Sequence, residues 1–343
     1  MTKISVIIPT FRRPEGLRRA VSSVLSQHGA PEFEIIVVDN APEGGARDAI
    51  WDLPATVPVQ LLHEPQPGVA TARNTGWRAA CAPRIAFLDD DEEAAPGWLA
   101  ALDAAATALD ADAVWGPIRT VLPEDANPAH ADFLRSFFAR TGPETVEPLS
   151  HYWGCGNSLI DRARAGLMEP PFDPAADQMG GEDDRLFSAM ERRGARFGWA
   201  PGALVGEHVP ASRATIRYAL ARSFAFGQGP SQTAADRKDL PRLAFWMGVG
   251  AAQTLVYGAA TGAMWATRAR RRGFMAGRTA QGLGKLIWFD AAAPKLYGAA
   301  QLAPVKTAAA QASSMISGAS SSGSAAPVTS AARAGASGST DSA

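Results

Sequence analysis

The sequence predicts an α/β fold in which a mostly parallel central sheet is flanked by helices. Short apolar runs such as Ile4–Ile8 and Ile35–Val38 are typical of buried parallel strands. Stretches with helical spacing alternate with these runs, as in sheets that carry helices on both faces. Acidic residues follow several runs directly, where such sheets bind their ligands.

The elements are expected in a regular order along the first third of the chain. Strands are predicted at residues 4–8, 34–38, 59–62, 84–88 and 113–116. A helix is predicted from Pro14, which suits a first helical turn, and apolar side chains continue it at helical spacing up to Leu25. Residues 68–80 and 94–109 are the next predicted helices, and a further one follows at 185–193.

Composition excludes several classes of protein. The 343 residues fit one large domain plus a smaller region, and a 46% hydrophobic content supports a sizeable core. The two cysteines, Cys81 and Cys155, suffice for neither a disulfide framework nor a four-cysteine zinc site, so a reducing compartment is expected. A net charge of −1 argues against nucleic-acid binding. No secretory signal is expected, because the first strand follows Met-Thr-Lys at once.

Charge is distributed unevenly along the chain. Acidic residues outnumber basic ones over residues 1–184, and the reverse holds over 185–306. The acidic part suits metal binding, and the basic, apolar part suits an anionic surface such as a membrane. Two ordinarily solvated faces are the alternative.

Residues 244–267 contain no charge and are followed by Arg268, Arg270, Arg271 and Arg272. This stretch is long enough to span a bilayer, but it is rich in Gly and Ala, and its aromatic residues suit an interfacial position. A buried hairpin of a soluble domain is the third interpretation. The expected organisation is a catalytic domain at 1–230, a helical and membrane-associated region at 231–303, and a disordered Ala/Ser/Gly-rich tail at 304–343.

Two acidic segments are candidates for chemistry. Asp89–Glu93 follows a buried strand, and its alternate residues Asp89 and Asp91 can present oxygens to one Mg²⁺ or Mn²⁺ ion. A solvated loop is the alternative. Glu182, Asp183 and Asp184 begin a helix after two glycines, where a carboxylate can act as a general base or merely favour the helix N-terminus.

Other polar residues give weaker signals. His208 can ligate a metal as a neutral imidazole, and Arg73 can bind a diphosphate; a structural histidine and a surface arginine are the alternatives. No P-loop, GxSxG elbow or GxGxxG follows the first strand, which excludes P-loop NTPases, α/β-hydrolases and standard dinucleotide folds.

Taken in order, the motifs resemble those of family 2 glycosyltransferases over about residues 3–230. The segments that carry the resemblance are Ser5–Arg13, Glu34–Asn40, Gly68–Asn74 (G-x-x-x-A-R-N), Phe87–Asp91, Trp153–Asn157 and Gly181–Asp183. The stretches GGEDDRLF, EHVPASRATI and RSFAFGQGPSQ are similar to bacterial exopolysaccharide enzymes of the succinoglycan kind. The resemblance implies a GT-A fold and transfer of glucose from UDP-glucose to a polyprenyl-diphosphate-linked oligosaccharide at the cytoplasmic face of the inner membrane.

The resemblance also implies roles for individual residues. The nucleotide would be bound by Pro9, Thr10, Asp39, Arg73 and Asp89, and the metal by Asp89, Asp91 and His208. The acceptor would face Trp153, Asn157 and Glu182, and Asp183 would be the base, with Asp184 a substitute. One departure is Asn40, where many members carry a second acid.

Two other functions are alternatives to a glycosyltransferase. A non-catalytic nucleotide-sugar-binding assembly protein would keep Asp39 and the metal acids but lose the base, and Glu182-Asp183 speaks against it. A sugar-1-phosphate nucleotidyltransferase would need a glycine-rich phosphate loop after the first strand, and Thr10–Pro14 contains no glycine.

Overall fold

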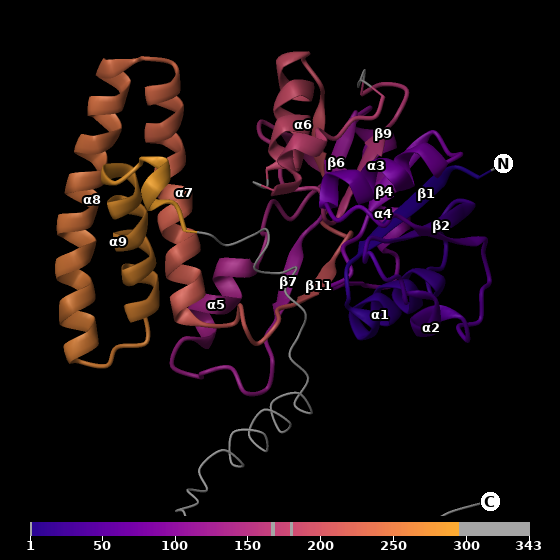
Figure 1. The fold of residues 1–343 in the computed structure, drawn as a ribbon, viewed down its shortest axis with the longest axis horizontal. Coiled ribbons are helices and arrows are strands. Elements are labelled where there is room, and N and C mark those ends of the chain that lie inside the picture. Colours follow the sequence, from indigo (N-terminus) through magenta and orange to yellow (C-terminus); the bar gives the residue numbers. More distant parts are fainter. Residues whose placement is uncertain (1, 166–168, 179–180, 295–343) are drawn as a thin grey trace, which may run out of the picture. The chain divides into compact units, whose positions relative to one another are not determined.

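The computed structural model describes residues 2–165, 169–178 and 181–294. Its central sheet has eight strands in the order β3-β2-β1-β4-β9-β6-β10-β8 (Figure 1). Six strands run parallel to one another, and β9 and β8 run opposite to them. The strands are β1 (Ile4–Thr10), β2 (Phe33–Asp39), β3 (Val59–His63), β4 (Arg84–Phe87), β6 (Ala113–Trp115), β8 (Glu147–Leu149), β9 (Ser158–Asp161) and β10 (Phe197–Trp199). The predicted mostly parallel sheet is confirmed, and the five predicted strands are β1, β2, β3, β4 and β6.

Helices cover both faces of this sheet because successive side chains of a strand point to opposite faces. On one face, Val6 and Ile8 of β1 pack with α1 (Pro14–Leu25) and α4 (Trp98–Ala108) in one core cluster. On the other face, Ile7 packs with α3 (Val69–Ala79) and α6 (Glu182–Arg192) in a second cluster. A strand buried on both faces is largely apolar, and β1 follows this rule, with the buried Ser5 donating its hydroxyl to Glu34 Oε1 (2.6 Å).

A second, smaller sheet positions the acidic segment. It has the order β5-β11-β7, with β5 (Glu92–Ala94) antiparallel and β7 (Ile118–Val121) parallel to β11 (Val205–His208). The helix expected from Ala94 therefore begins only at Trp98, because residues 92–94 form backbone hydrogen bonds with β11. This pairing brings His208, far away in the sequence, beside the acids that follow β4.

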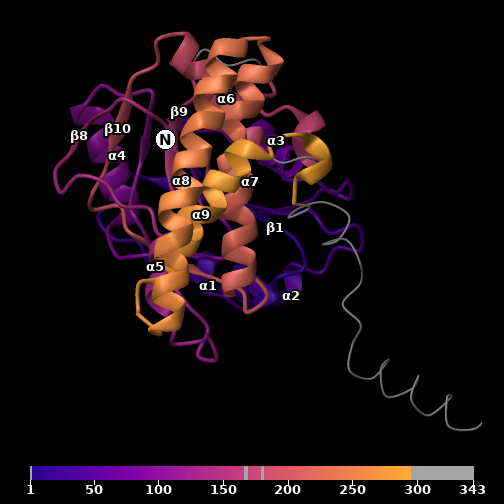
Figure 2. The ribbon, with the colours of Figure 1, turned by 90° about the vertical axis from the view of Figure 1, so that its left-hand side faces the viewer.

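The C-terminal helices α7 (Ile216–Asp236), α8 (Leu240–Ala266) and α9 (Arg272–Leu286) lie side by side (Figures 1 and 2). Small residues allow the close approach: a Cβ added at Gly284 of α9 would lie 2.1 Å from the carbonyl oxygen of Phe224 in α7. α7 runs without a break through residue 230, the predicted end of the catalytic domain. The tail expected at 304–343 lies outside the described residues.

The remaining short elements connect the strands and helices described above or follow α9. They are α2 (Arg47–Ile50), α5 (Ala131–Phe138), η1 (Pro174–Gln178) and η2 (Asp290–Ala292). α5 packs against β7 and α7, and Phe133 of α5 contacts Phe274 of α9 with ring centroids 5.4 Å apart. The C-terminal helices are therefore joined to the sheets by apolar contacts.

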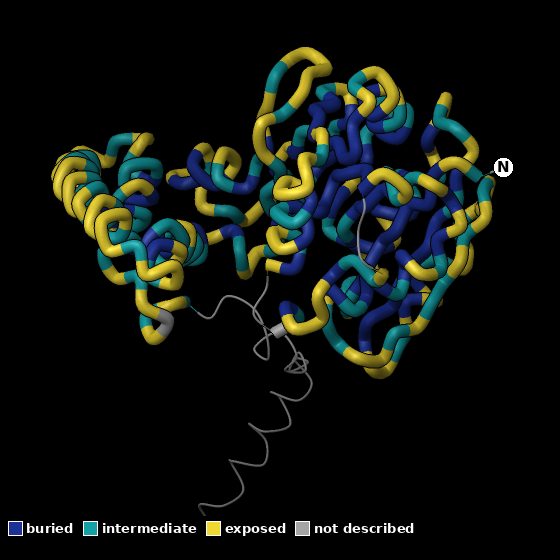
Figure 3. Tube along the Cα trace, turned by 90° about the horizontal axis from the view of Figure 1, so that it is seen from above, coloured by how far each residue is buried: buried dark blue, intermediate teal, exposed yellow. Residues whose placement is uncertain are grey.

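α8 is long and apolar enough to cross a membrane by length and composition. Only 6% of its most apolar 18-residue window is buried, so it is not the core helix of a soluble domain. Figure 3 shows mostly exposed residues along it. Of the three interpretations of this segment, the buried hairpin does not fit the structure.

Candidate active site

The three aspartates after β4 differ in burial. The Asp90 side chain is buried, and its carboxylate accepts hydrogen bonds from the Thr10 hydroxyl (2.8 Å) and Arg13 Nη1 (2.9 Å). Burial raises the pKa of Asp90 to about 6, although the charge of Arg13 opposes this shift. Asp89 and Asp91 are more exposed, with 34% and 17% of their side chains accessible. Asp90 therefore anchors the turn from inside, and the two aspartates beside it keep more of their side chains accessible.

The Arg13 guanidinium neutralises part of this acidic segment. Its Nη1 lies 2.8 Å from Asp91 Oδ2 and 2.9 Å from Asp90 Oδ1. Burial and the like charge of Asp89 nevertheless raise the pKa of Asp91, against the opposing effect of Arg13. Negative charge is therefore crowded at this edge, which is the condition that a cation relieves.

Arg73 connects the two acidic segments that the sequence singled out. It lies in α3 with its side chain 5% exposed, and its Nη2 is 3.0 Å from Asp89 Oδ1 while its Nη1 is 2.5 Å from Glu182 Oε1. Burial lowers its pKa, but the surrounding negative groups outweigh burial and raise it above its ordinary value. Both terminal nitrogens thus bind protein carboxylates, and Nε has no hydrogen-bond partner among the described residues.

Asp183 lies half-buried at the N-terminus of α6, directly after the Glu182 that binds Arg73. Its Oδ2 accepts a hydrogen bond from the backbone N–H of Cys155 (3.3 Å), and its Oδ1 accepts one from Asp184 N (2.8 Å). A Cβ added at Gly154 would lie only 2.9 Å from Asp183 Oδ2. Glycine at 154 therefore leaves the space in which this carboxylate sits.

Trp153 and Asn157 of the segment 153–157 were expected to face the acceptor, but the two side chains differ in exposure. Trp153 is partly exposed, with its ring 5.2 Å from the His151 ring by centroids. Asn157 is fully buried: its Oδ1 accepts from Trp98 Nε1 (2.8 Å), and its Nδ2 donates to two backbone carbonyls. Trp153 thus stays partly accessible, whereas the Asn157 side chain faces the interior. Glu182, also expected on the acceptor side, is buried against Arg73.

Two residues that support the site were not singled out by the sequence. Glu92 is buried, and its Oε2 accepts hydrogen bonds from the backbone N–H groups of Asp89 (3.0 Å) and Asn157 (3.1 Å). Burial and the like charge of Asp89 raise its pKa well above the ordinary value. Arg140 is buried and donates to the carbonyls of Gly154 and Gly156. Glu92 belongs to the acidic run, but no local signal marks Arg140, because its role depends on packing.

The residues expected at the nucleoside lie at the ends of neighbouring strands. Thr10 and Asp39 are register partners in β1 and β2, and Pro9 is buried one position earlier. The Asp39 carboxylate accepts hydrogen bonds from the N–H groups of Ala41 (3.2 Å) and Ala46 (2.8 Å). Asp39 therefore shapes the loop that follows β2.

Asn40, the departure from the family pattern, has a structural explanation. Its Nδ2 donates to the carbonyls of Glu64 (3.0 Å) and Gln66 (2.7 Å), while its Oδ1 accepts from Gly68 N (2.7 Å). An ionised aspartate accepts hydrogen bonds but cannot donate them. The amide is therefore the group that joins the end of β2 to the start of α3.

The backbone of His208 contacts Asp91, whereas its ring contacts Glu93. Its N–H donates to the Asp91 carbonyl (2.8 Å), while its ring Nε2 is 2.9 Å from Glu93 Oε2. Among the described residues, no three His, Cys, Asp or Glu side chains converge as a metal-holding group. Neighbouring Glu207 adds negative charge, and burial followed by the charge of Asp91 raises its pKa to about 7.

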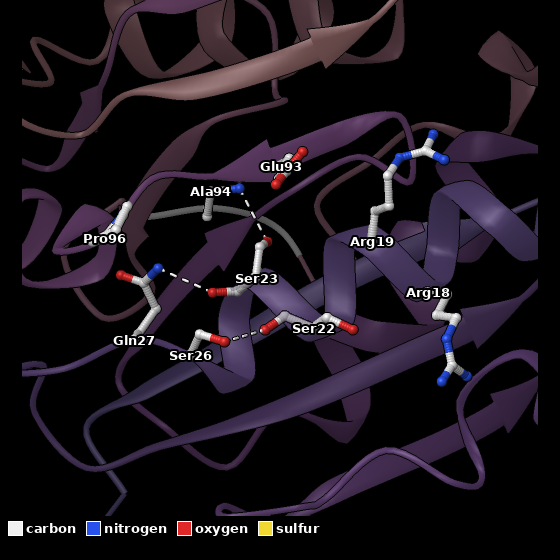
Figure 4. A pocket seen from close by; sticks show the side chains of 9 residues that line it. All are labelled: Arg18, Arg19, Ser22, Ser23, Ser26, Gln27, Glu93, Ala94 and Pro96. Carbon is white, nitrogen blue, oxygen red and sulfur yellow. Dashed lines mark hydrogen bonds between the residues drawn. The ribbon is translucent and has the colours of Figure 1, made fainter.

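α1 supports the acidic segment from outside the site. The backbone N–H of Ala94 in β5 donates to Ser23 Oγ (3.0 Å), and Gln27 Nε2 donates to the Ala95 carbonyl (3.0 Å). Figure 4 shows Ser23, Gln27 and Ala94 among the residues that line a pocket beside α1, together with Arg18 and Arg19. This pocket is separate from Arg73 and Asp183, and its contacts serve to fix β5.

Comparisons with known proteins identify the family of this chain. Residues 5–163 match the model of glycosyl transferase family 2. The chain is 30% identical over 277 residues to the succinoglycan biosynthesis protein ExoM of Rhizobium meliloti strain 1021, covering 79% of this chain and 88% of ExoM. It is 35% identical over 105 residues to a validoxylamine A glucosyltransferase of Streptomyces hygroscopicus subsp. limoneus, covering 30% of this chain and 23% of that relative.

One solved structure is also similar in part. S. aureus TarS 1–349 in complex with UDP-GlcNAc gives a TM-score of 0.46 at 18% identity, covering 61% of this chain and 59% of the other. The full-length likeness to ExoM and the family match carry the assignment, and the glycosyltransferases among the relatives speak against a non-catalytic assembly protein. The chain belongs to glycosyl transferase family 2 and is a glycosyltransferase.

Proposed function

We propose that this enzyme transfers a hexose, glucose in the first instance, from a UDP-sugar to a hydroxyl of a lipid-linked oligosaccharide during exopolysaccharide assembly. The observation that carries the proposal is the bridge made by Arg73, which binds both Asp89 and Glu182 through one guanidinium and so holds the segment that contains Asp183 near the acids after β4. The name of the relative ExoM, a succinoglycan biosynthesis protein, supports the assembly context.

The donor would lie across the ends of β1, β2 and β4. Pro9, Thr10 and Asp39 would line the nucleoside, since they lie at the ends of adjacent parallel strands. Asp89 would accept hydrogen bonds from the ribose. Arg73 would act beneath the nucleotide by holding Asp89, because its terminal nitrogens are already bound to carboxylates.

Asp89 and Asp91 would hold a divalent cation, Mg²⁺ or Mn²⁺, and His208 would join them by exchanging the contact of its ring Nε2 with Glu93 for the ion. Two crowded carboxylates fit such a hard ion, which completes its shell with water and phosphate oxygens. Burial and then the like charge of Asp89 raise the pKa of Asp91, and a cation would relieve the repulsion between the two carboxylates. When bound, the ion would neutralise charge that develops on the departing diphosphate.

Asp183 would be the general base of an inverting, single displacement. Its carboxylate would take the proton of the acceptor hydroxyl while that oxygen bonds to the anomeric carbon and the bond from this carbon to the UDP oxygen breaks. The hydrogen bond from Cys155 N would fix the orientation of Asp183, and Gly154 leaves it space. Trp153 would pack against the acceptor sugar.

The acceptor would be polyprenyl-diphosphate-linked, which places the enzyme at the cytoplasmic face of the inner membrane. The apolar and exposed helix α8 supports a position at a membrane. The basic residues that follow it would meet anionic lipid headgroups.

Calorimetric titration with UDP tests the proposal most directly. We expect UDP to bind in the presence of Mn²⁺ and to bind much more weakly with EDTA, and GDP and dTDP to bind less well. Preference for another nucleotide would overturn the UDP-sugar assignment. Binding that is equal with Mn²⁺ and EDTA would overturn the metal site.

A further inference from the structure

The outward side of α8 forms a continuous apolar surface. Phe245, Leu255 and Val256 are 61%, 76% and 63% exposed. Small residues fill the intervening exposed positions at helical spacing; we define the apolar face as Phe245, Gly248, Ala252, Leu255, Val256, Ala259 and Ala263. Exposed apolar surfaces of this extent mark sites that dock onto another molecule or a membrane.

Cationic residues lie at both ends of this face. Arg237, Lys238 and Arg242 are exposed at its start, and Arg268 and Arg271 are exposed at its end. An apolar helix face flanked by exposed arginines and lysines complements an anionic lipid surface, where the cations meet phosphate groups and the apolar face enters the acyl boundary. The charge pattern therefore favours a bilayer over a second copy of this equally basic region.

The middle of α8 distinguishes a helix that lies on the membrane from one that crosses it. Arg278 of α9 is exposed and lines a shallow groove with Val249, Val256 and Tyr257 of α8. Lys285 of α9 also reaches the middle of α8, where its Nζ lies 3.2 Å from Gln253 Oε1. If α8 crossed the bilayer, both cations would lie near its centre, where charged side chains are strongly disfavoured.

α9 cannot be separated from α8 to avoid this cost. A Cβ added at Gly282 of α9 would lie 2.6 Å from Thr254 Oγ1, so the two helices are in close contact at mid-length. Thr261 and Thr279 hydroxyls lie 3.1 Å apart further along the same contact. Any orientation of α8 in a membrane therefore carries Arg278 and Lys285 with it.

We propose that α8 lies in the plane of an anionic membrane surface, with its apolar face at the boundary between headgroups and acyl chains, and that the α8–α9 hairpin does not span the bilayer. Arg278 meets lipid phosphates along the side of the face, and the two terminal clusters meet them at its ends. The inference deepens the membrane partner of the proposed function and rests on it, but it requires neither donor nor acceptor.

Vesicle flotation of the full chain tests the surface and its charge. We expect binding to vesicles of phosphatidylcholine with phosphatidylglycerol, weakening with salt, and little binding to phosphatidylcholine alone. Val256→Asp should weaken binding to vesicles about tenfold or more, because it removes apolar area that the membrane would bury on binding. The matched control Val146→Asp, at a valine 46% exposed outside this helix, should bind like the wild type. Equal binding to neutral vesicles, or full binding by Val256→Asp, would overturn the proposal.

Cysteine labelling tests the orientation. In a Cys81→Ser background, which removes the exposed native thiol, single cysteines are introduced by Asp236→Cys and Thr267→Cys at opposite ends of α8. With the protein bound to intact vesicles, an impermeant maleimide should label both positions equally. Protection of either one until detergent is added would show a spanning helix and overturn the proposal. UDP titration without lipid reports separately on the proposed function.

Discussion

Around the proposed base, the carboxylates differ in what each one contacts. Glu182 is buried against Arg73, Asp183 is half-buried beside Gly154, and Asp184 is exposed and accepts a hydrogen bond from the Tyr152 hydroxyl (2.9 Å). A base needs access to substrate together with a fixed orientation. Of the three acids, Asp183 combines these two properties.

Asp183→Asn should therefore remove most turnover and leave donor binding intact. Loss of a general base costs about 10²-fold or more in rate, while the shape and hydrogen bonding of the side chain are nearly kept. Measuring kcat and the Kd for UDP separates the two effects. Asp184→Asn is the matched control and should retain most of its turnover. If Asp183→Asn turned over like the wild type, another residue would be the base.

Arg73→Lys should reduce turnover at least tenfold, because one ammonium cannot make the two separate contacts of a planar guanidinium. Asp89 and Glu182 would then no longer be held to one group. The effects of Arg73→Lys and Glu182→Gln on turnover should be coupled. The double variant should therefore lose less kcat, on a free-energy scale, than the two single variants lose together. A double-mutant cycle on kcat measures this coupling. Strictly additive losses would contradict the bridge.

Glu207 should make stability depend on pH. Its pKa is raised to about 7 in the folded protein, so the folded state binds a proton more tightly than the unfolded chain. Its contribution is present below the ordinary glutamate pKa and is lost as the pH rises towards 7. With EDTA present, the unfolding free energy of the wild type should fall relative to Glu207→Gln between pH 4.5 and 7, by on the order of 2 kcal/mol. If the unfolding free energies of the wild type and Glu207→Gln changed equally with pH across that range, the raised pKa of Glu207 would be contradicted.

At the level of elements, glycines determine how closely the C-terminal helices pack. Gly284 of α9 meets the backbone of α7, whereas Gly248 of α8 has no atom within 4 Å of an added Cβ. Both lie inside helices, so they share the same intrinsic cost relative to alanine. The difference between them is therefore a difference in contact.

Gly284→Ala should destabilise the protein by about 1–3 kcal/mol, since the new methyl would force α7 and α9 apart. Gly248→Ala should instead be neutral or stabilising by about 0.5–1 kcal/mol, because it improves helix propensity without a clash. Urea unfolding of the two variants provides the comparison. A stabilising Gly284→Ala would show that the α7–α9 contact is looser than described.

At the level of the whole molecule, ligand binding should stabilise the entire fold. The proposed donor would touch β1, β2 and β4, which are adjacent strands of the large sheet. A ligand at about 100 times its Kd adds about 2.7 kcal/mol to the unfolding free energy. We expect UDP with Mn²⁺ to raise the Tm, and EDTA or Asp91→Asn to remove most of that rise. An equal rise in Asp91→Asn would argue against the role of Asp91.

Much of the fold and of the site was predictable, because local patterns encode it. Buried parallel strands leave apolar runs, and the acids after β4 lie at a strand end for the same reason. The start of α4 was not predictable, since Glu92–Ala94 become a strand only by pairing with β11, more than 100 residues later. Arg140 left no signal because its partners are backbone carbonyls.

Patterns along the chain suffice for the α/β sheet, the family motifs and the apolar character of residues 244–267. Three other features arise when distant segments pack together: Arg73 binds two carboxylates, Asn157 faces the interior, and Arg278 lies at mid-length of α8. The reason is physical: strand and helix patterns are set by neighbours along the chain, whereas the partner of a charged side chain is set by which distant segments pack together.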